Sequence, residues 1–328
     1  MLLTLFSALI FAAAPATGAG ASQPGTLMTL KAPENVWDCA AEDFDQNGVN
    51  DLLLSCCDER SDPLKKLVAV YLASADGAYP AEPSFTCPLD ESVGVLFLAE
   101  VDGKAPRELV AADAEGAQIY RFENGALVKG AKVDCASLFP TRAKEPLFLK
   151  NTASDLDGDG KDEWLIPVPR VYDVWDGAKR KARVNCDVVS ELRRMDAVMV
   201  INRLPAVQSF DLPGTPGKAL AFLSDEFADF ATGPGWAKHT RVRIPVNMAE
   251  KWDASAKMAD INNDGFPDLM VTQTKGTVNL TTTTQVYIAP EPMKYADKPT
   301  ATFTAEGSIA SPSLLDVNND GLRDMVVI

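Results

Sequence analysis

Histidine is nearly absent from this chain of 328 residues, because His239 is the only one. Six cysteines are present, but none stands at a CxxC or Cys/His spacing that would suggest a zinc or haem site. No Gly-x-Ser-x-Gly or comparable nucleophile motif lies near His239, so a serine or cysteine hydrolase is not indicated. We therefore expect His239 to be an ordinary strand or surface residue.

Positive charge is also scarce, since 31 Lys and Arg residues face 46 Asp and Glu residues, for a formal net charge of -15. Nucleic acids and anionic membrane surfaces bind proteins through clusters of Lys and Arg, so neither is an expected partner. After the N-terminal leader no stretch approaches the about 18 unbroken apolar residues of a membrane-spanning helix. The mature chain is therefore not expected to span a membrane.

Residues 1–21 form an apolar leader that ends in Ala19, Gly20 and Ala21. A hydrophobic stretch followed by small residues is the pattern of a secretory signal peptide and its cleavage site. Six cysteines also fit an oxidising compartment. We expect residues 22–328 to form a single domain that is secreted or periplasmic, and hence extracytoplasmic, once the signal peptide is removed.

Amphipathic helical periodicity is almost missing, and only the segment 187–196 (DVVSELRRMD) suggests a helical excursion. A nine-residue motif recurs instead. Close copies start at residues 43, 155, 260 and 316 and weaker copies at 100 and 211, so that successive starts are 57, 55, 56, 49 and 56 residues apart. Six copies at nearly constant spacing indicate an internal structural repeat.

Each repeat has the pattern of short strands separated by turns. The close copies are DFDQNGVND, DLDGDGKDE, DINNDGFPD and DVNNDGLRD, and each precedes an apolar run such as LLLS or LMVT. About four strands fit a unit of roughly 55 residues, the size of one β-propeller blade. The sequence thus predicts an all-β β-propeller of about six to seven four-stranded blades. We expect the last blade to be incomplete or closed by an N-terminal strand near residues 26–31.

This motif, its spacing and the strand that follows it resemble the FG-GAP and VCBS repeats of secreted bacterial proteins and of the integrin α-chain N-terminal propeller. The resemblance covers about residues 30–328 and is strongest in the four close copies. It implies that each loop joins the innermost strand of a blade to the next strand outwards and holds one Ca²⁺ ion. Seven blades are usual in that family, whereas this chain has six loops.

The loops also suit calcium on chemical grounds. Ca²⁺ takes at least about six oxygen ligands, and side chains at alternate positions of a tight loop can turn their oxygens inward. Positions 1, 3, 5 and 9 would supply side chains and position 7 a backbone carbonyl, while Gly at position 6 permits the sharp turn. The predicted ligands of about four Ca²⁺ ions are Asp43, Asp45, Asn47, Val49, Asp51, Asp155, Asp157, Asp159, Lys161, Glu163, Asp260, Asn262, Asp264, Phe266, Asp268, Asp316, Asn318, Asp320, Leu322 and Asp324.

Two other kinds of loop share part of this pattern. An EF-hand loop begins in the same way but needs Glu at position 12 and flanking helices, whereas position 12 here is apolar and lies in strand-like runs. Plain Asp/Asn/Gly turns are the second alternative. Acids packed within nine residues repel one another unless a cation neutralises them, which favours metal binding. Glu163 replaces the usual Asp at position 9, and its site is expected to be altered or to recruit Asp162.

The two weaker copies lack ligands. In the second loop, Lys104 stands at position 5, where its ammonium group could replace the metal between Glu100 and Asp102. In the fourth loop, ligand positions are taken by Pro213, Thr215 and Ala219. We expect no Ca²⁺ in either loop, with the strand-turn-strand geometry retained.

Folding the first loop back on itself places Cys39 near Cys56, which predicts a disulfide from Cys39 to Cys56 or Cys57. Free buried thiols are the alternative for all six cysteines. No pairing can be derived for Cys87, Cys135 or Cys186.

Two functions follow from these patterns. The first is a secreted calcium-binding propeller that acts as a binding or scaffolding module for an extracellular or periplasmic protein or glycan. The alternative is a propeller enzyme or accessory domain acting on polysaccharide, because propellers host active sites as well as binding sites. The sequence offers no catalytic set, since the clustered acids are expected to face their ions, so enzymatic activity is left open.

Overall fold

The computed structural model describes residues 29–139, 148–186, 189–194, 198–203, 205–223, 227–244, 253–276, 279–307, 313–315 and 324–326. The predicted signal peptide, residues 1–21, lies outside this part of the chain. No helix within the described ranges is long and apolar enough to cross a membrane.

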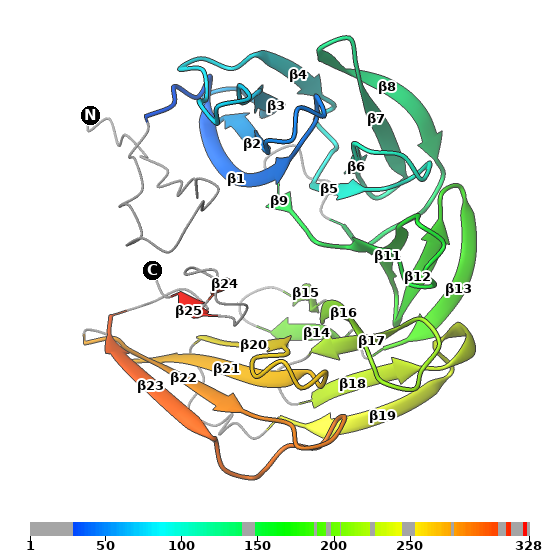
Figure 1. Cartoon of the computed structure of the whole chain (residues 1–328), viewed down its shortest axis with the longest axis vertical. Coiled ribbons are helices and arrows are strands. Elements are labelled where there is room, and N and C mark those ends of the chain that lie inside the picture. The colour runs from blue at the N-terminus through cyan, green and yellow to red at the C-terminus, as the bar shows by residue number, and fades with distance from the viewer. Residues whose placement is uncertain are drawn as a thin grey trace. The chain divides into compact units, whose positions relative to one another are not determined.

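Strands dominate the chain and form sheets in sequence order (Figure 1). The first sheet contains β1 (Asn35–Glu42), β2 (Asp51–Asp58), β3 (Lys65–Tyr71) and β4 (Phe85–Leu89). The second contains β5 (Val95–Ala99), β6 (Glu108–Ala112), β7 (Ala117–Glu123) and β8 (Ala126–Val133), and β9 (Phe148–Leu149) pairs in parallel with β5. The third contains β10 (Ala153–Ser154), β11 (Glu163–Val168), β12 (Val171–Asp176) and β13 (Lys179–Asn185).

The later sheets repeat this order. The fourth contains β16 (Ala206–Asp211), β17 (Lys218–Leu223), β18 (Phe227–Thr232) and β19 (Lys238–Arg243), with the short 3₁₀ helix η1 (Pro234–Trp236) before β19. The fifth contains β20 (Asp253–Ala259), β21 (Asp268–Lys275), β22 (Thr281–Tyr287) and β23 (Ala301–Glu306). Strands β24 (Ser313–Leu315) and β25 (Asp324–Val326) form an antiparallel pair.

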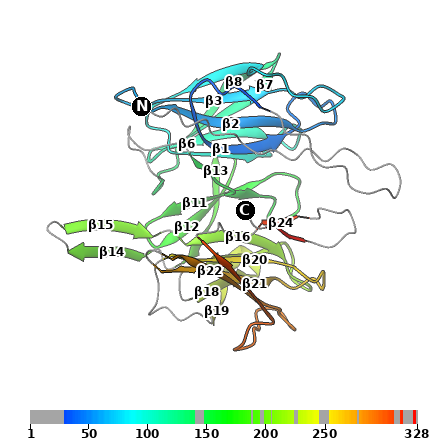
Figure 2. The same cartoon turned by 90° about the vertical axis from the view of Figure 1, so that its left-hand side faces the viewer.

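Successive four-stranded sheets of this kind are propeller blades, so the predicted all-β β-propeller fold is confirmed. The predicted number of six to seven blades is wrong, because the described residues form five blades of four sequential strands. Counting loops overestimated the blades, since the sixth loop adds only the pair β24–β25 to the described strands. Figure 2 shows β1, β2 and β3 of the first blade side by side, in agreement with their antiparallel registers.

Two local predictions are corrected or limited by the structure. The helical excursion expected at 187–196 is wrong, because β14 (Val189–Arg194) and β15 (Val198–Arg203) pair as an antiparallel hairpin (Figure 2). The closing strand expected near 26–31 lies partly outside the described residues. Its described end contacts the first blade, where the backbone N–H of Lys31 donates to the carbonyl of Ala81 at 2.9 Å.

Burial explains why the second strand of each blade follows the loop as an unbroken apolar run. β2 is buried along all but its last residue, whereas β1 alternates between exposed and half-buried positions. The first two blades share a core in which Leu53 and Val70 meet Leu96 and Tyr120. Strands that are covered on both faces have no solvent side, so apolar residues occupy successive positions instead of alternating.

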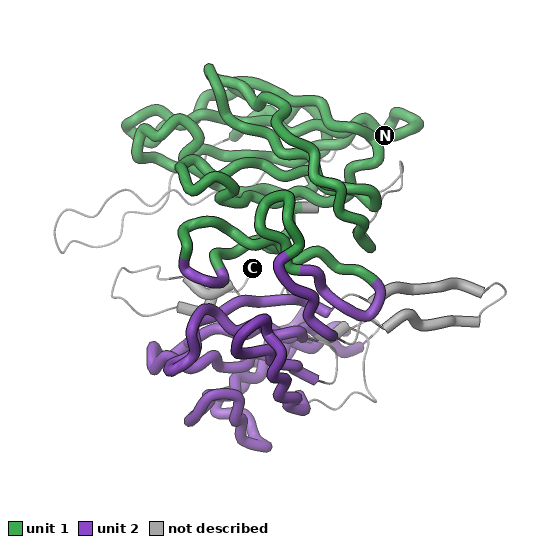
Figure 3. The backbone as a smooth tube through the Cα atoms, turned by 90° about the vertical axis from the view of Figure 1, so that its right-hand side faces the viewer, with its two compact units in different colours: residues 1–155, 159–168, 174–180 green, residues 156–158, 169–173, 181–328 purple. Residues whose placement is uncertain are grey.

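Contacts divide the chain into two compact units (Figure 3). The first comprises residues 1–155, 159–168 and 174–180, and the second comprises residues 156–158, 169–173 and 181–328. The third sheet contains residues of both. In the second unit the fourth and fifth blades share a core of their own, in which Phe230 and Leu223 pack with Leu269 and Tyr287.

Candidate metal sites

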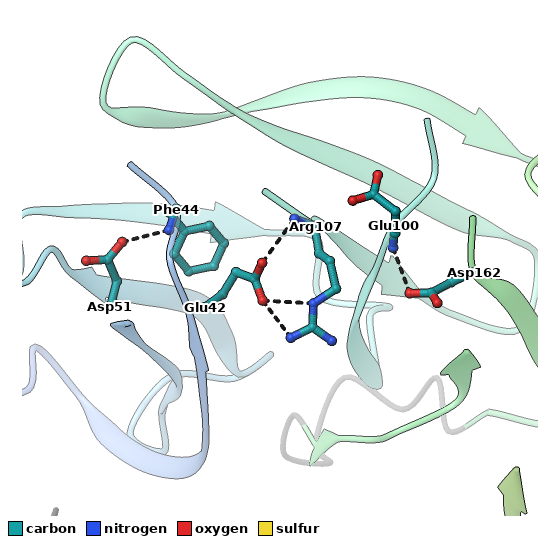
Figure 4. Close-up of polar contacts among 6 residues, drawn as sticks. All are labelled: Glu42, Phe44, Asp51, Glu100, Arg107 and Asp162. Carbon is teal, nitrogen blue, oxygen red and sulfur yellow. Dashed lines mark hydrogen bonds and ion pairs between the residues drawn. The ribbon is translucent and has the colours of Figure 1, made fainter. Parts of the chain in front are cut away.

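The first loop, residues 43–51, is organised by the carboxylate of Asp51 at position 9. Asp51 opens β2 and is fully buried. Its Oδ2 accepts a hydrogen bond from the backbone N–H of Phe44 at 2.8 Å, and its Oδ1 accepts from the N–H of Ala73 at 2.7 Å. One carboxylate therefore joins the start of the loop to the chain that follows β3 (Figure 4 draws the bond to Phe44).

The remaining acids of this loop converge on the same place. Asp43 accepts hydrogen bonds from the backbone N–H groups of Asn47 at 3.0 Å and Gly48 at 2.9 Å. Asp43, Asp45 and Asp51 each offer an oxygen, and these three atoms lie within 4.8 Å of one another. Burial raises the pKa of Asp51, and the nearby charge of Asp45 raises it further. Such a group of repelling carboxylates would be stabilised by a cation.

The fifth loop, residues 260–268, repeats these backbone hydrogen bonds at the same positions. The buried Asp268 accepts from the backbone N–H of Ile261 at 2.8 Å and from that of Ala289 at 2.8 Å. Asp260 accepts from the N–H groups of Asp264 at 3.1 Å and Gly265 at 2.9 Å. Burial raises the pKa of Asp268, and the charges of Asp264 and Asp260 add to the effect.

The third loop, residues 155–163, keeps the acids but adds a basic neighbour. Oxygens of Asp155, Asp157 and Asp159 lie within 4.8 Å of one another. Lys181 of β13 forms an ion pair with Asp157 at 2.5 Å. Glu163 at position 9 is buried, as Asp51 and Asp268 are in the first and fifth loops. Asp162 accepts from the backbone N–H of Glu100 at 2.8 Å (Figure 4), so its carboxylate contacts the second loop.

Backbone conformation separates these three loops from the weaker copies. Positions 4 and 6 both have positive φ in all three, at Gln46 and Gly48, at Gly158 and Gly160, and at Asn263 and Gly265. Glycine adopts this left-handed region without steric cost, which explains Gly at position 6 of every close copy. In the sixth loop, the predicted ligands Asp316, Asn318, Asp320 and Leu322 lie outside the described residues, and Asp324 begins β25.

In the second loop, residues 100–108, a basic side chain of the protein contacts the acids. Its position 9 residue, the buried Glu108, accepts from the backbone N–H of Val101 at 3.0 Å and from Nε of Arg121 at 3.2 Å. Arg121 also lies 3.5 Å from Asp102. The prediction that Lys104 fills this role is wrong, since Arg121 is the basic residue that contacts these acids. It lies on β7, outside the motif, so the spacing gave no signal for it.

In the fourth loop, residues 211–219, no carboxylate cluster is found, and the strand-turn-strand geometry predicted for both weaker copies is retained. Thr215 stabilises the turn, because its N–H and Oγ1 both donate to the carbonyl of Leu212, at 3.1 and 2.7 Å. Ala219 at position 9 is buried in β17. The turn therefore forms without acidic ligands.

The FG-GAP-like repeat family model matches residues 260–327, a span that begins at Asp260, the first residue of the fifth loop. Residues 260–327 are thus similar to an FG-GAP-like repeat. No curated protein sequence matches this chain.

Solved structures similar to this chain include the exotype rhamnogalacturonan lyase YesX, with 15% identity and a TM-score of 0.44, and the rhamnogalacturonan lyase YesW, with 15% identity and a TM-score of 0.41. Each match covers 74% of this chain and 44% of the lyase chain. The chain thus spans less than half the length of these two structures.

Neighbouring loops among the first four are linked to one another. The guanidinium of Arg107 donates to Glu42 from Nε at 2.8 Å and Nη2 at 2.5 Å, and its backbone N–H adds a third bond at 3.2 Å (Figure 4). In the third loop the backbone N–H of position 8, Asp162, donates to the carbonyl of Glu100 at 2.7 Å. In the fourth loop the backbone N–H of position 8, Lys218, donates to the carbonyl of Leu156 at 2.8 Å. Position 8 of one loop therefore repeatedly bonds the beginning of the loop before it.

The predicted disulfide of the first blade is wrong, because all six cysteines are free. In the register of β1 and β2, Cys39 lies opposite Leu54, and Cys56 lies opposite Val36. This register is continuous from Glu42 opposite Asp51 to Cys39 opposite Leu54, and only beyond Cys39 does a bulge near Trp37 shift it further. Burial raises the pKa of the Cys56 thiol to about 12, so this thiol is held protonated and unreactive.

His239 lies on β19, with Nδ1 3.4 Å from Asp229, a carboxylate that also pairs with Arg241 at 3.0 Å. The first unit also contains a pocket of about 260 Å³, which is lined by residues of β1, β5 and β9 and of the chain next to them. Its lining includes Asp38, Arg107, Lys150 and Asn151.

Proposed function

We propose that the first, third, fifth and sixth loops each bind a Ca²⁺ ion, and that the protein is a calcium-stiffened binding or scaffolding module outside the cytoplasm. The observation that carries this proposal is the pair of buried carboxylates, Asp51 and Asp268. Each is surrounded by further acids of its own loop, and each has its pKa raised by burial and by those acids. A divalent ion would remove this repulsion.

The donor set also fits a hard cation. The predicted ligands are carboxylate, amide and carbonyl oxygens, which Ca²⁺ prefers. Asp51 and Asp268 already accept two backbone N–H bonds each, and a carboxylate has about four lone-pair directions, so capacity for a metal is left. When bound, the ion would neutralise the acids and join positions 1, 3 and 5 to the carboxylate that holds the blade.

Elemental analysis and calorimetry test the metal proposal. The protein dialysed against calcium buffer should retain about four Ca²⁺ ions, and EDTA should lower its melting temperature by many degrees. At a free concentration of 100 times Kd, one site stabilises the fold by about 2.7 kcal/mol. Asp43→Asn with Asp45→Asn should remove one ion. The matched control is Asp211→Asn in the fourth loop, which should change nothing. An unaltered melt in EDTA, or no bound calcium, would refute the proposal.

For the partner, we propose a polar protein or glycan surface that places a group in the pocket beside β1. The lining offers a carboxylate at Asp38, an amide at Asn151 and an ammonium at Lys150, which together can hydrogen-bond hydroxyl or amide groups. A glycan array and a pull-down with the calcium-loaded protein would identify candidates. Binding that survives Asn151→Ala combined with Lys150→Ala would place the partner elsewhere.

Export is the remaining part of the proposal. Expression of the full chain in a secreting host, followed by N-terminal sequencing, should find the mature protein outside the cytoplasm and beginning near Ser22. Retention of residues 1–21 in a cytoplasmic product would contradict it.

A further inference from the structure

The position 9 carboxylates of the first, second and fifth loops can be compared directly. Asp51, Glu108 and Asp268 are all buried, and each accepts a hydrogen bond from the backbone N–H of position 2 in its own loop. In the first and fifth loops the other oxygen accepts from a backbone N–H just after the third strand. In the second loop it accepts from the side chain of Arg121.

Arg121 reaches the second loop from the third strand of the same blade, β7. Its Nε lies 3.2 Å from Glu108 and its Nη2 lies 3.5 Å from Asp102, so one guanidinium contacts positions 9 and 3. Oxygens of Glu100, Asp102 and Glu108 lie within 4.8 Å of one another, as the acids of the first loop do. The positive group therefore lies among the side chains that correspond to metal ligands in the other loops.

The acids of the second loop need such a partner. Burial raises the pKa of Glu100, and the charges of Glu108 and Asp102 contribute in the same direction. The other basic residue of the loop is not placed to help through its side chain, because Lys104 contacts Glu100 through its backbone N–H at 2.6 Å. A planar guanidinium with several fixed donors can contact two carboxylates at once, which a backbone amide cannot do.

We propose that Arg121 is a built-in replacement for the metal of the second loop. In this role the guanidinium holds positions 3 and 9 together without an ion, and its removal turns Glu100, Asp102 and Glu108 into a divalent cation site. The second loop is then independent of calcium, whereas the first and fifth depend on it. The identity of the ion that enters the emptied loop rests on the proposed function, but the role of Arg121 does not.

The test is whether removing the positive charge of Arg121 increases the number of metal ions bound per chain. Arg121→Met and Arg121→Gln should each bind one more Ca²⁺ per chain than the wild type, as measured by equilibrium dialysis and elemental analysis. In EDTA both variants should melt below the wild type, and added Ca²⁺ should recover most of the difference. Arg121→Lys should gain no ion, and the matched control Lys104→Met should keep the wild-type stoichiometry. Combining Arg121→Met with Glu108→Gln should abolish the added ion.

The outcomes separate this inference from the calcium proposal. If the wild type binds no Ca²⁺ while Arg121→Met binds one, the inference holds and the proposed function fails. If wild type and both Arg121 variants bind the same number of ions, and Ca²⁺ recovers none of the lost stability, the inference is overturned while the proposed function stands. A gain of metal by Lys104→Met would equally overturn it. Circular dichroism at saturating Ca²⁺ confirms that each variant is folded.

Discussion

The first and second loops lie in adjacent blades and begin 57 residues apart, yet their acids are held in two different ways. In the first loop, Asp51 accepts two backbone N–H groups, and the acids around it contact no basic side chain among the described interactions. In the second loop, Arg121 contacts the acids directly. In both loops the position 9 carboxylate accepts two hydrogen bonds, but in the second loop one of the two donors is a cationic side chain instead of a backbone amide.

The fourth loop extends this lesson. Ala219 occupies position 9, no acid cluster is present, and the turn is closed by Thr215 on the carbonyl of Leu212. The flanking strands still pair in the same register as in the other blades. The pairing of β16 with the buried β17 therefore suffices to form the turn, and no acid cluster is needed for it.

The largest expected effect comes from removing the position 9 carboxylates. Asp51→Ala should destabilise the protein by about 2–5 kcal/mol in EDTA, because two buried N–H groups, of Phe44 and Ala73, lose their acceptor. Glu108→Ala should cost about 1–3 kcal/mol, since only the N–H of Val101 is stranded and the half-exposed Arg121 can turn to solvent. Urea unfolding measures both. Equal costs would mean that the two loops are not held differently.

A second, smaller effect should appear in the pH dependence of stability. The pKa of Asp51 is raised above the ordinary value of 3.8, chiefly by burial. A raised carboxyl pKa contributes stability that is fully present below the unfolded pKa and is lost as pH rises through the folded value. In metal-free protein, the stability of the wild type relative to Asp51→Asn should therefore fall as pH rises from about 4 to 7.

Calcium should weaken or reverse this fall near neutral pH, because the ion favours the ionised carboxylate. The fixed cost of replacing one oxygen by an amide group cancels from the pH slope, so the slope reports the titration of Asp51 together with its coupling to the neighbouring acids. Chemical denaturation at several pH values measures it. A slope of zero in the metal-free protein would show that the acids of the first loop do not repel one another enough to need a cation.

Several features of this comparison could be predicted from the sequence. The motif starts locate the first five loops, which the structure describes, and the apolar runs after them correspond to the buried second strands, because an apolar run is read directly from neighbouring residues of the chain. Arg121 could not be found in this way. It lies 13 residues beyond Glu108, and only the pairing of β6 with β7 brings the two together. The blade number and the bulge at Trp37 likewise depend on pairing between strands.

The smallest expected effect concerns the contact that links the two loops. Arg107 and Glu42 form a two-pronged ion pair, with 42% of the arginine side chain and 15% of the glutamate side chain exposed. A double-mutant cycle of Glu42→Gln and Arg107→Met should give a coupling energy of about 0.5–2 kcal/mol, reduced by salt because the pair is partly in solvent. The backbone N–H of Arg107 keeps its bond to residue 42 in both variants, so the cycle isolates the guanidinium. If the coupling grows when Ca²⁺ is added, the metal state of the first loop is transmitted to the second. If it is the same with and without Ca²⁺, each loop is stabilised locally, and the two modes of neutralisation act independently in adjacent blades.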